Sequence, residues 1–173
     1  MAVRVAALTR DDLRSDLIET KSLMQTWSLR GAPTIFPTAE AGTFLNALAA
    51  QPDEVPDEIN LDGTFYRQRH ELLEALRQAC AVLEHKTIVG KAQLDHDLAE
   101  AMKPFLPKTV RVRADEPSLV AENQTLLEAA VSYLLRQCAL EGRVMMGERQ
   151  GNQPAFSSPA VWFDHPLDRS APP

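Results

Sequence analysis

Residues 22–37 read SLMQTWSLRGAPTIFP, an apolar run that is interrupted by Arg30 and Gly31. Successive side chains of a strand point to opposite faces, which places Gln25 and Trp27 together on one face of an extended chain. Gly31 supplies the backbone freedom that a tight turn needs. The stretch therefore predicts a β-hairpin with Arg30 at its tip.

Two interpretations of this hairpin remain open: a core hairpin whose Arg30 is solvated, or a wing whose tip contacts a phosphate backbone. A similar element recurs near the other end of the chain. Residues 142–148 (GRVMMGE) form a short apolar strand, residues 149–153 (RQGNQ) a polar turn, and residues 154–158 (PAFSS) a returning strand. A helical pattern leads directly into it, as in a winged helix.

Composition describes a globular protein of 173 residues with 45% hydrophobic residues and a formal net charge of -6. The acidic balance counts against a protein that coats nucleic acid, because such binding depends on a basic surface. Charge is uneven, however. Residues 40–62 carry acids and no lysine or arginine, whereas residues 103–113 carry four basic residues and no acid. This basic run is either a solvated loop or a phosphate contact.

Cys80 and Cys138 lie inside helical patterns, without the spacing of a metal site, and are expected to be small buried residues of a reducing compartment. The apolar part of the N-terminal residues MAVRVAALTR is too short for a signal peptide, and no run reaches the length of a membrane span. We therefore expect a cytoplasmic protein that does not contact a membrane.

Residues 1–50 are expected to form a partial winged-helix module. A first helix begins at Thr9, which can cap the amide near Asp12, and Thr38 is expected to cap a second, short helix after the hairpin. Residues 51–63 are rich in proline and acidic residues and are expected to be a linker.

Residues 64–165 are expected to form a complete winged helix-turn-helix, followed by a tail over residues 166–173. Apolar periodicity predicts three helices: one from Thr64, one marked by Ile88 to Met102, and one that Pro117 opens and Gly142 ends. The fold class is therefore mainly α with short β-hairpins, in a tandem winged helix-turn-helix arrangement.

In that arrangement the third helix would be the recognition helix, with Gln124, Ser132 and Gln137 on the side that faces a groove. Acidic residues on the same helix weaken this assignment. The residues expected to contact DNA are Arg30, Arg136, Arg143 and Arg149, with secondary phosphate contacts from Lys108, Arg111 and Arg113.

Two stretches carry a resemblance to a known family: LIETKSLMQTWSLRGAPTIFPTAEAGTFLNAL (residues 17–48) and GRVMMGERQGNQPAFSSPAVWF (residues 142–163). Both resemble the winged-helix DNA-binding family of AlkZ-like and YcaQ-like DNA glycosylases. The resemblance implies tandem winged helices that bind double-stranded DNA and, in active members, hydrolysis of the N-glycosidic bond of alkylated or crosslinked bases without a metal. The chain resembles an internal portion of such proteins, as a truncated or divergent member would.

One departure from the family concerns catalysis. Family catalysis depends on a Gln-x-Gln or Gln-x-Arg motif upstream of the hairpin, and neither motif occurs in this sequence. Gln25 is the first glutamine of the chain, but it lies in the predicted strand, at a position that is usually basic in the family. We therefore assign no catalytic residue.

Outside these stretches, one group of residues could bind a metal. Residues 91–100 place Gln93, Asp97 and Glu100 on one helical side beside His96, which is the geometry of a metal site or, more simply, of a solvated helix face. No cofactor is expected. The sequence predicts a DNA-binding module, with two alternatives left open: a protein-interaction module that could form a homodimer, and a residual DNA glycosylase.

Overall fold

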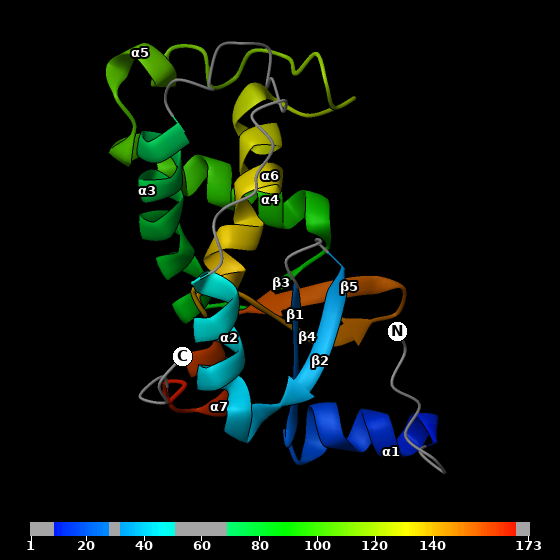
Figure 1. Ribbon diagram of the computed structural model, residues 1–173. Helices are drawn as coiled ribbons and strands as arrows, with labels where there is room; N and C mark the ends of the chain where they lie inside the picture. Colours follow the sequence, from blue (N-terminus) through cyan, green and yellow to red (C-terminus); the bar gives the residue numbers. More distant parts are fainter. Residues whose placement is uncertain (1–8, 28–31, 51–68, 169–173) are drawn as a thin grey trace.

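The computed structural model describes residues 9–27, 32–50 and 69–168 (Figure 1). Helices α3 (Arg69–Ala79), α4 (Lys91–Met102) and α6 (Leu126–Leu140) pack together at one end, and a sheet lies at the other. The shorter elements are α1 (Arg10–Arg14), the π-helix η1 (Ser15–Glu19), η2 (Thr38–Glu40), α2 (Ala41–Ala49), η4 (Cys80–Glu84), η5 (Lys103–Phe105), α5 (Lys108–Arg111) and α7 (Pro159–Phe163).

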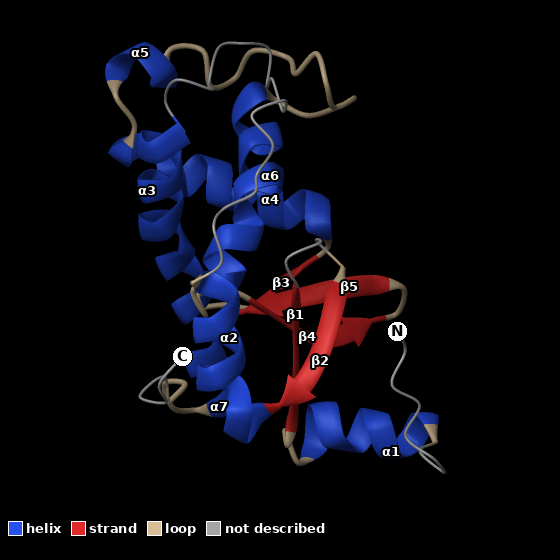
Figure 2. Cartoon of the chain, viewed as in Figure 1, coloured by secondary structure: helices blue, strands red, loops and turns tan. Residues whose placement is uncertain are grey.

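The sheet has five strands, all paired antiparallel, in the order β2-β1-β4-β5-β3 (Figure 2). These strands are β1 (Leu23–Trp27), β2 (Pro33–Pro37), β3 (Ile88–Val89), β4 (Met145–Gln150) and β5 (Gln153–Ser157). The N-terminal hairpin joins the C-terminal hairpin where Gln25 pairs with Met146. The two hairpins that the sequence predicts therefore belong to one continuous sheet.

The predicted N-terminal hairpin is confirmed in its two strands, which pair from Leu23 with Pro37 to Trp27 with Pro33. Its turn, with Arg30, lies outside the described residues. Burial alternates along β1 as a strand requires: Met24 is buried and the neighbouring Gln25 is half-buried. The buried face of the hairpin is therefore the face opposite Gln25.

The helical end holds the main core. Its buried residues come mainly from α3, α4 and α6, with others from η4, α5, the connecting segments and the sheet residues Ile88 and Phe156. Thr125 begins α6 with a capping box, in which its side chain accepts from the Glu128 amide and the Glu128 carboxylate accepts from the Thr125 amide. Gly142 ends α6 at φ 74°, a left-handed conformation that favours glycine, as predicted.

The start of the third helix differs from the sequence prediction. Residue Pro117 does not open α6; it bridges to Thr125 and closes a loop, and the helix begins only at Leu126. Leu119 and Val120, which share the helical spacing, are exposed on this loop. Periodicity misled the prediction because two exposed apolar residues fell in phase with the buried stripe of α6.

Three smaller predictions are also corrected. Ile88 lies in strand β3 rather than in the second helix, because it pairs with Phe156 of β5. Part of the predicted basic loop is the short helix α5. Thr38 does not cap a helix, because its hydroxyl donates to the Lys21 carbonyl oxygen at 2.7 Å. The start of the first helix of this half, predicted at Thr64, lies outside the described residues.

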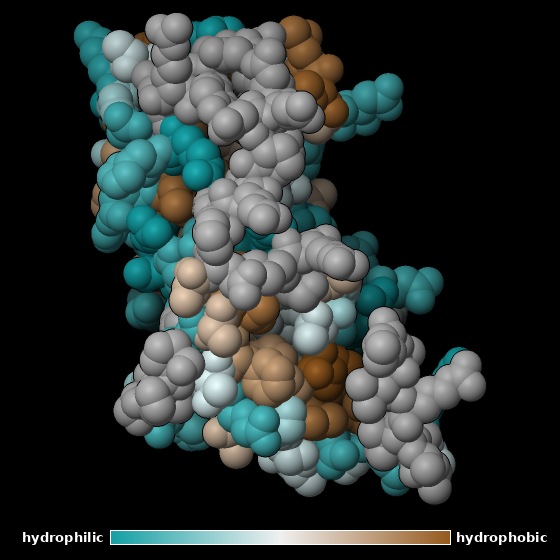
Figure 3. Space-filling model, in the orientation of Figure 1, coloured by the Kyte–Doolittle hydropathy of each residue, from teal (hydrophilic) through white to brown (hydrophobic). Residues whose placement is uncertain are grey.

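A second, smaller buried cluster lies under α2 and α7. It consists of Met24, Phe36, Ala41, Leu45, Met145 and Phe163. Helix α2 also packs against α6. On the outer side of β2 and α2, Ile35 and Phe44 are exposed, and hydrophobic surface gathers over these two elements (Figure 3).

The fold class is thus a mixed α/β arrangement in which short hairpins form a single antiparallel sheet. The helices and hairpins of the prediction are present, whereas the tandem winged-helix arrangement and its boundaries stay a prediction. Within the described ranges, every helix is too short or too polar to cross a bilayer.

Candidate functional site

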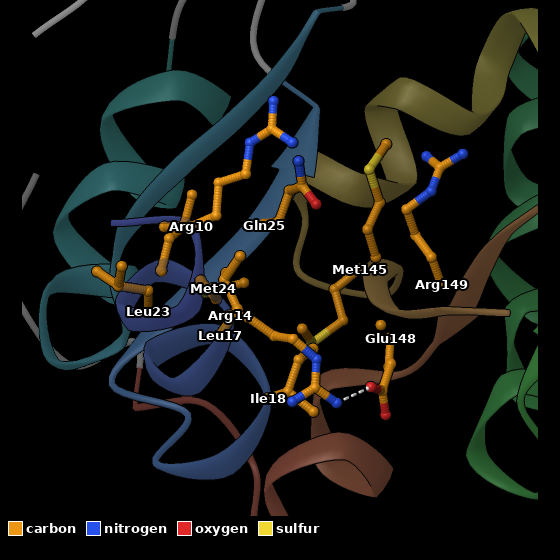
Figure 4. Close-up of a pocket in the computed structure, with 13 residues that line it drawn as sticks. Arg10, Arg14, Leu17, Ile18, Leu23, Met24, Gln25, Met145, Glu148 and Arg149 are labelled. Carbon is orange, nitrogen blue, oxygen red and sulfur yellow. Dashed lines mark hydrogen bonds and ion pairs between the residues drawn. The ribbon is translucent and has the colours of Figure 1, made fainter. Parts of the chain in front are cut away.

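A cleft of about 290 Å³ opens between the N-terminal helical segment and the sheet (Figure 4). We call the segment formed by α1 and η1, residues 10–19, the arm. The arm forms one wall, and strands β1 and β4 form the floor and the other wall. The cleft is lined by Arg10, Leu13, Arg14, Leu17, Ile18, Leu23, Met24, Gln25, Met145, Met146, Gly147, Glu148 and Arg149.

The arm is well formed locally but buries nothing. Thr9 caps it as predicted, and the structure adds a capping box, in which the Thr9 hydroxyl accepts from the Asp12 amide at 3.1 Å and the Asp12 carboxylate accepts from the Thr9 amide at 2.9 Å. The Thr9 hydroxyl also lies 2.6 Å from the Asp12 carboxylate, and this hydrogen bond, with the one from the Thr9 amide, holds the pKa of Asp12 below its usual range. No residue of α1 or η1 is buried, and the leucines that face the sheet remain half-exposed. The arm therefore covers one side of an accessible apolar cleft.

The floor of the cleft is the seam at which the two hairpins meet. Gln25 of β1 lies opposite Met146 of β4 at this seam. Next to it, Gly147 lets the Trp162 ring of α7 lie close to β4, since a Cβ atom on Gly147 would be 2.9 Å from a ring carbon. Lys21 lies over the same ring, 5.2 Å from its centroid, and anchors the end of the arm.

Charge at the cleft has the opposite sign to that of the whole chain. Three arginines and one glutamate line the cleft, in a chain with 24 acidic and 18 basic residues. Arg14 pairs with Glu148 at 2.6 Å, which bridges the arm and β4 and raises the pKa of Arg14. Among the described residues, Arg10 forms no ion pair or hydrogen bond, and Arg149 donates only to the Asn152 carbonyl oxygen.

Of the arginines expected to contact DNA, Arg149 is the one that the structure places at this cleft. Arg143 lies elsewhere, and its guanidinium donates to Glu141 at 3.1 Å. Glu141 also accepts from Arg77 at 2.6 Å, so this cluster is internally neutralised. Arg30 lies outside the described residues.

The residues expected to make secondary phosphate contacts lie around α5, at the end of the molecule away from the sheet (Figure 1). Lys108 and Arg111 are exposed on α5. Arg113 pairs with Glu116 at 2.6 Å and lowers the pKa of that carboxyl. The structure therefore does not bring these three residues to the side of the cleft.

Helix α6 exposes little of the surface that a recognition helix needs. Ten of its fifteen residues are buried, and α2 and β1 pack against it in addition to α3 and α4. Ser132 accepts a hydrogen bond from Lys91 at 2.8 Å, Arg136 is half-buried, and Gln137 donates to Glu141 at 3.4 Å. Gln124 precedes the helix and donates to the buried Asp95 at 3.3 Å. These polar side chains already have partners within the protein.

The cleft residues Arg10, Arg14 and Glu148 were not singled out from the sequence. A signal was available, because Arg10 and Arg14 are four residues apart and lie on one side of a helix that Thr9 caps. Their position opposite β4 could not be inferred, since it depends on how the arm packs on a sheet formed by two distant hairpins.

No group of three metal-ligating side chains occurs within the described ranges. His96 is instead paired with Glu128 at 2.8 Å, which raises the pKa of the imidazole, and Asp97 is paired with Lys86 at 2.6 Å. Cys80 and Cys138 are both buried and unbridged, and their hydrogen bond raises the pKa of the Cys138 thiol.

The chain is similar to a known protein family and to a solved structure. The family described as DNA glycosylase AlkZ-like matches residues 1–172. Among solved structures, the DNA glycosylase AlkZ of Streptomyces sahachiroi is similar, with 20% sequence identity and a TM-score of 0.58, over 94% of this chain and 38% of that one. That likeness concerns the fold alone, and no curated protein matches. From the match over nearly its whole length, the chain belongs to the AlkZ-like DNA glycosylase family.

Proposed function

We propose that this chain binds double-stranded DNA through the side of the molecule that carries the cleft. The observation that carries the proposal is the cluster of Arg10, Arg14 and Arg149 on one side of an acidic protein. A family of DNA glycosylases implies DNA as the substrate. Arginines within reach of a phosphate backbone supply sequence-independent affinity, whatever the net charge of the rest of the chain.

The order of elements supports a wing as the contact. From α3 to β5 the order is helix, strand, helix, helix and hairpin, which is that of a winged helix. We propose residues 64–165 as this module, with residues 1–50 joined to it through the shared sheet and residues 51–63 as the connection. Because α2 covers part of α6, the hairpin β4–β5 is the more accessible contact, and Arg149 lies next to its turn.

On this proposal the chain by itself binds DNA and does not excise a base. The Gln-x-Gln and Gln-x-Arg motifs are missing from the sequence, and a base-excising enzyme needs a polar group that holds the attacking water. Incubation of the purified chain with a duplex that contains an alkylated base should release no base above the rate without protein. Release above that rate would favour the residual glycosylase.

The test is fluorescence anisotropy of a labelled duplex. For two phosphate contacts, affinity should fall about tenfold between about 50 and about 200 mM salt. Replacing Arg10 and Arg149 together by Ala should weaken binding at low salt and reduce the slope of log affinity against log salt by about 2. The matched control replaces Lys108 and Arg111 by Ala, which removes the same charge from α5 and should leave binding unchanged. Equal losses in both variants would contradict the proposed face.

One observation favours a second candidate, a protein-interaction module. Leu119 and Val120 are 77% and 60% exposed on the loop that the bridge between Pro117 and Thr125 closes. Neighbouring exposed apolar residues are typical of protein contacts. If this candidate holds, the chain should associate in sedimentation experiments, the variant with Leu119→Ser and Val120→Ser should not, and neither should bind DNA at low salt.

A further inference from the structure

We infer that the end of the molecule formed by α5 and the loop after it is a self-association surface, and that its partner is a second copy of this chain. We call residues 115–125 the tip loop. The inference takes up the exposed loop of the second candidate function and names its partner. It does not depend on DNA binding at the cleft, because α5 and the tip loop lie at the other end of the molecule from the sheet (Figure 1).

Exposed apolar side chains are concentrated at this end. Among the described residues, seven large hydrophobic side chains are exposed, and four of them fall between residues 105 and 120: Phe105 (54%), Val112 (69%), Leu119 (77%) and Val120 (60%). Hydrophobic surface is also visible at this end of the molecule in Figure 3. Clustered apolar side chains on a protein surface are typical of sites at which proteins associate. This end therefore offers apolar surface that a partner would cover.

The tip loop is held in shape by its own hydrogen bonds. The Ser118 hydroxyl accepts from the Val120 amide at 3.2 Å, and the Ser118 amide donates to the Gln124 carbonyl oxygen at 2.9 Å. The Gln124 side chain donates to Asp95 of α4 at 3.3 Å, and that carboxylate is 1% exposed. A loop that is tied to the core in this way loses little conformational entropy when a partner binds. The structure therefore presents Leu119 and Val120 in a form that is ready for contact.

Charges at this end are divided between the two elements. Arg113, which follows α5, pairs with Glu116 of the tip loop at 2.6 Å, so this pair is neutralised within the chain. Lys108 and Arg111 of α5 are exposed, as is Glu122 of the tip loop, and none of the three forms an ion pair or hydrogen bond with a described residue. The unpaired charges are therefore positive on α5 and negative on the tip loop.

The two elements are complementary to each other, and this favours a second copy as the partner. Figure 1 shows α5 at one side of this end and the chain between α5 and α6 reaching across to the other side. A two-fold axis between them places the tip loop of each copy on α5 of the other, so that every contact is made twice. Glu122 then meets Lys108 and Arg111 of the second copy, and Leu119 meets Val112.

The first test is the oligomeric state of the purified chain by sedimentation velocity. A contact between patches of this size is small, so we expect a dissociation constant on the order of 10 μM, with mainly dimer at about 100 μM and mainly monomer at about 1 μM. Leu119→Ser with Val120→Ser should be monomeric at both concentrations. Ile35→Ser, at an exposed apolar side chain of β2 at the sheet end, is the control and should dimerise like the wild type.

Charge reversal then tests which surfaces meet. Glu122→Lys makes the tip loop positive, and Lys108→Glu with Arg111→Glu makes α5 negative, so each variant alone brings like charges together twice across the two-fold axis. In an equal mixture each positive patch meets a negative patch, and a heterodimer should form about tenfold more tightly than either variant alone dimerises. Glu84→Lys, an equal charge change at an exposed residue of η4, is the control and should dimerise like the wild type.

The outcomes separate self-association from DNA binding. A wild-type chain that stays monomeric at about 100 μM would overturn the inference, leave this surface to a different protein and leave salt-dependent duplex binding standing. Dimerisation of the variant with Leu119→Ser and Val120→Ser would place the contact elsewhere and overturn the inference too. A mixture that associates no better than its components would overturn the pairing of α5 with the tip loop. A chain that dimerises as expected and binds no duplex at low salt would overturn the proposed function alone.

Discussion

The helical end buries its apolar side chains, whereas the arm leaves its apolar side chains partly exposed. In the described residues, the main core joins 25 buried residues, nearly all from α3, α4, α6 and the segments that connect them. The arm also presents an apolar side, through Leu13, Leu17 and Ile18, but buries none of them. Both regions have helical spacing and a threonine capping box, so local sequence does not explain the difference.

The difference lies in what each helix packs against. Helix α6 has neighbours on several sides, whereas the arm has the sheet on one side and the open cleft beside it. Ser132 at the helical end accepts a hydrogen bond from Lys91, whereas the side chains of Arg10 and Gln25 at the cleft have no partner among the described residues. Buried packing is thus concentrated at the helical end, and the arm is the less stably packed region.

The largest effect should come from a cavity at the helical end. Leu98→Ala, at a side chain that is 0% exposed, should lower the free energy of unfolding by about 2–5 kcal/mol, because the packed helices cannot close the space. Leu17→Ala in the arm should cost about 1 kcal/mol or less, since that side chain is half-exposed. Urea denaturation measures both. Equal costs would show that the arm belongs to the same cooperative core.

The two capping boxes offer a matched pair. Thr125→Ala removes the cap of α6 and should lower the free energy of unfolding by about 1 kcal/mol. Thr9→Ala removes the same cap from the arm, and should accelerate hydrogen exchange of the Leu13 amide without changing the urea midpoint. A shift of the midpoint by Thr9→Ala would contradict the division into two regions.

Glu148 should oppose ligand binding at the cleft. Glu148→Gln removes the nearer of the two carboxylates that pair with Arg14 and keeps Glu19 at 3.2 Å, so less negative charge opposes a phosphate and DNA affinity should rise at low salt. The effect should shrink as salt increases. Glu116→Gln, which removes the carboxylate that pairs with Arg113 at the far end, is the control and should leave affinity unchanged.

The smallest effect concerns pH. Glu128 raises the pKa of His96 in the folded protein above that of the unfolded chain, so the charged pair stabilises the fold at a pH below about 6.5 and the stabilisation is lost as pH rises through the folded pKa. The difference in unfolding free energy between the wild type and His96→Gln should therefore be larger near pH 6 than near pH 9. The imidazole is exposed and Glu128 is half-buried, and a difference independent of pH would show that the charge contributes nothing.

Local sequence patterns predicted the secondary-structure elements that line the cleft, but they did not predict the cleft. Alternation identified the strand that carries Gln25, and the turn-rich sequence after β4 identified the hairpin that carries Arg149. The helix that Thr9 caps was also predicted, without the role of its arginines. That the polar side of the third helix faces a groove stays a prediction, because the pattern that marks a buried stripe does not show how many neighbours cover the rest of the helix.

The sequence by itself determined the hairpin strands, the helix cap at Thr9 and the end of α6 at Gly142, since each depends on residues a few positions apart. Only the tertiary structure decided that Gln25 pairs with Met146, more than a hundred residues away, and that Arg14 reaches Glu148. Pairings at that separation depend on the packing of the whole chain. The cleft exists because two hairpins share a sheet and a short arm covers one side of their seam.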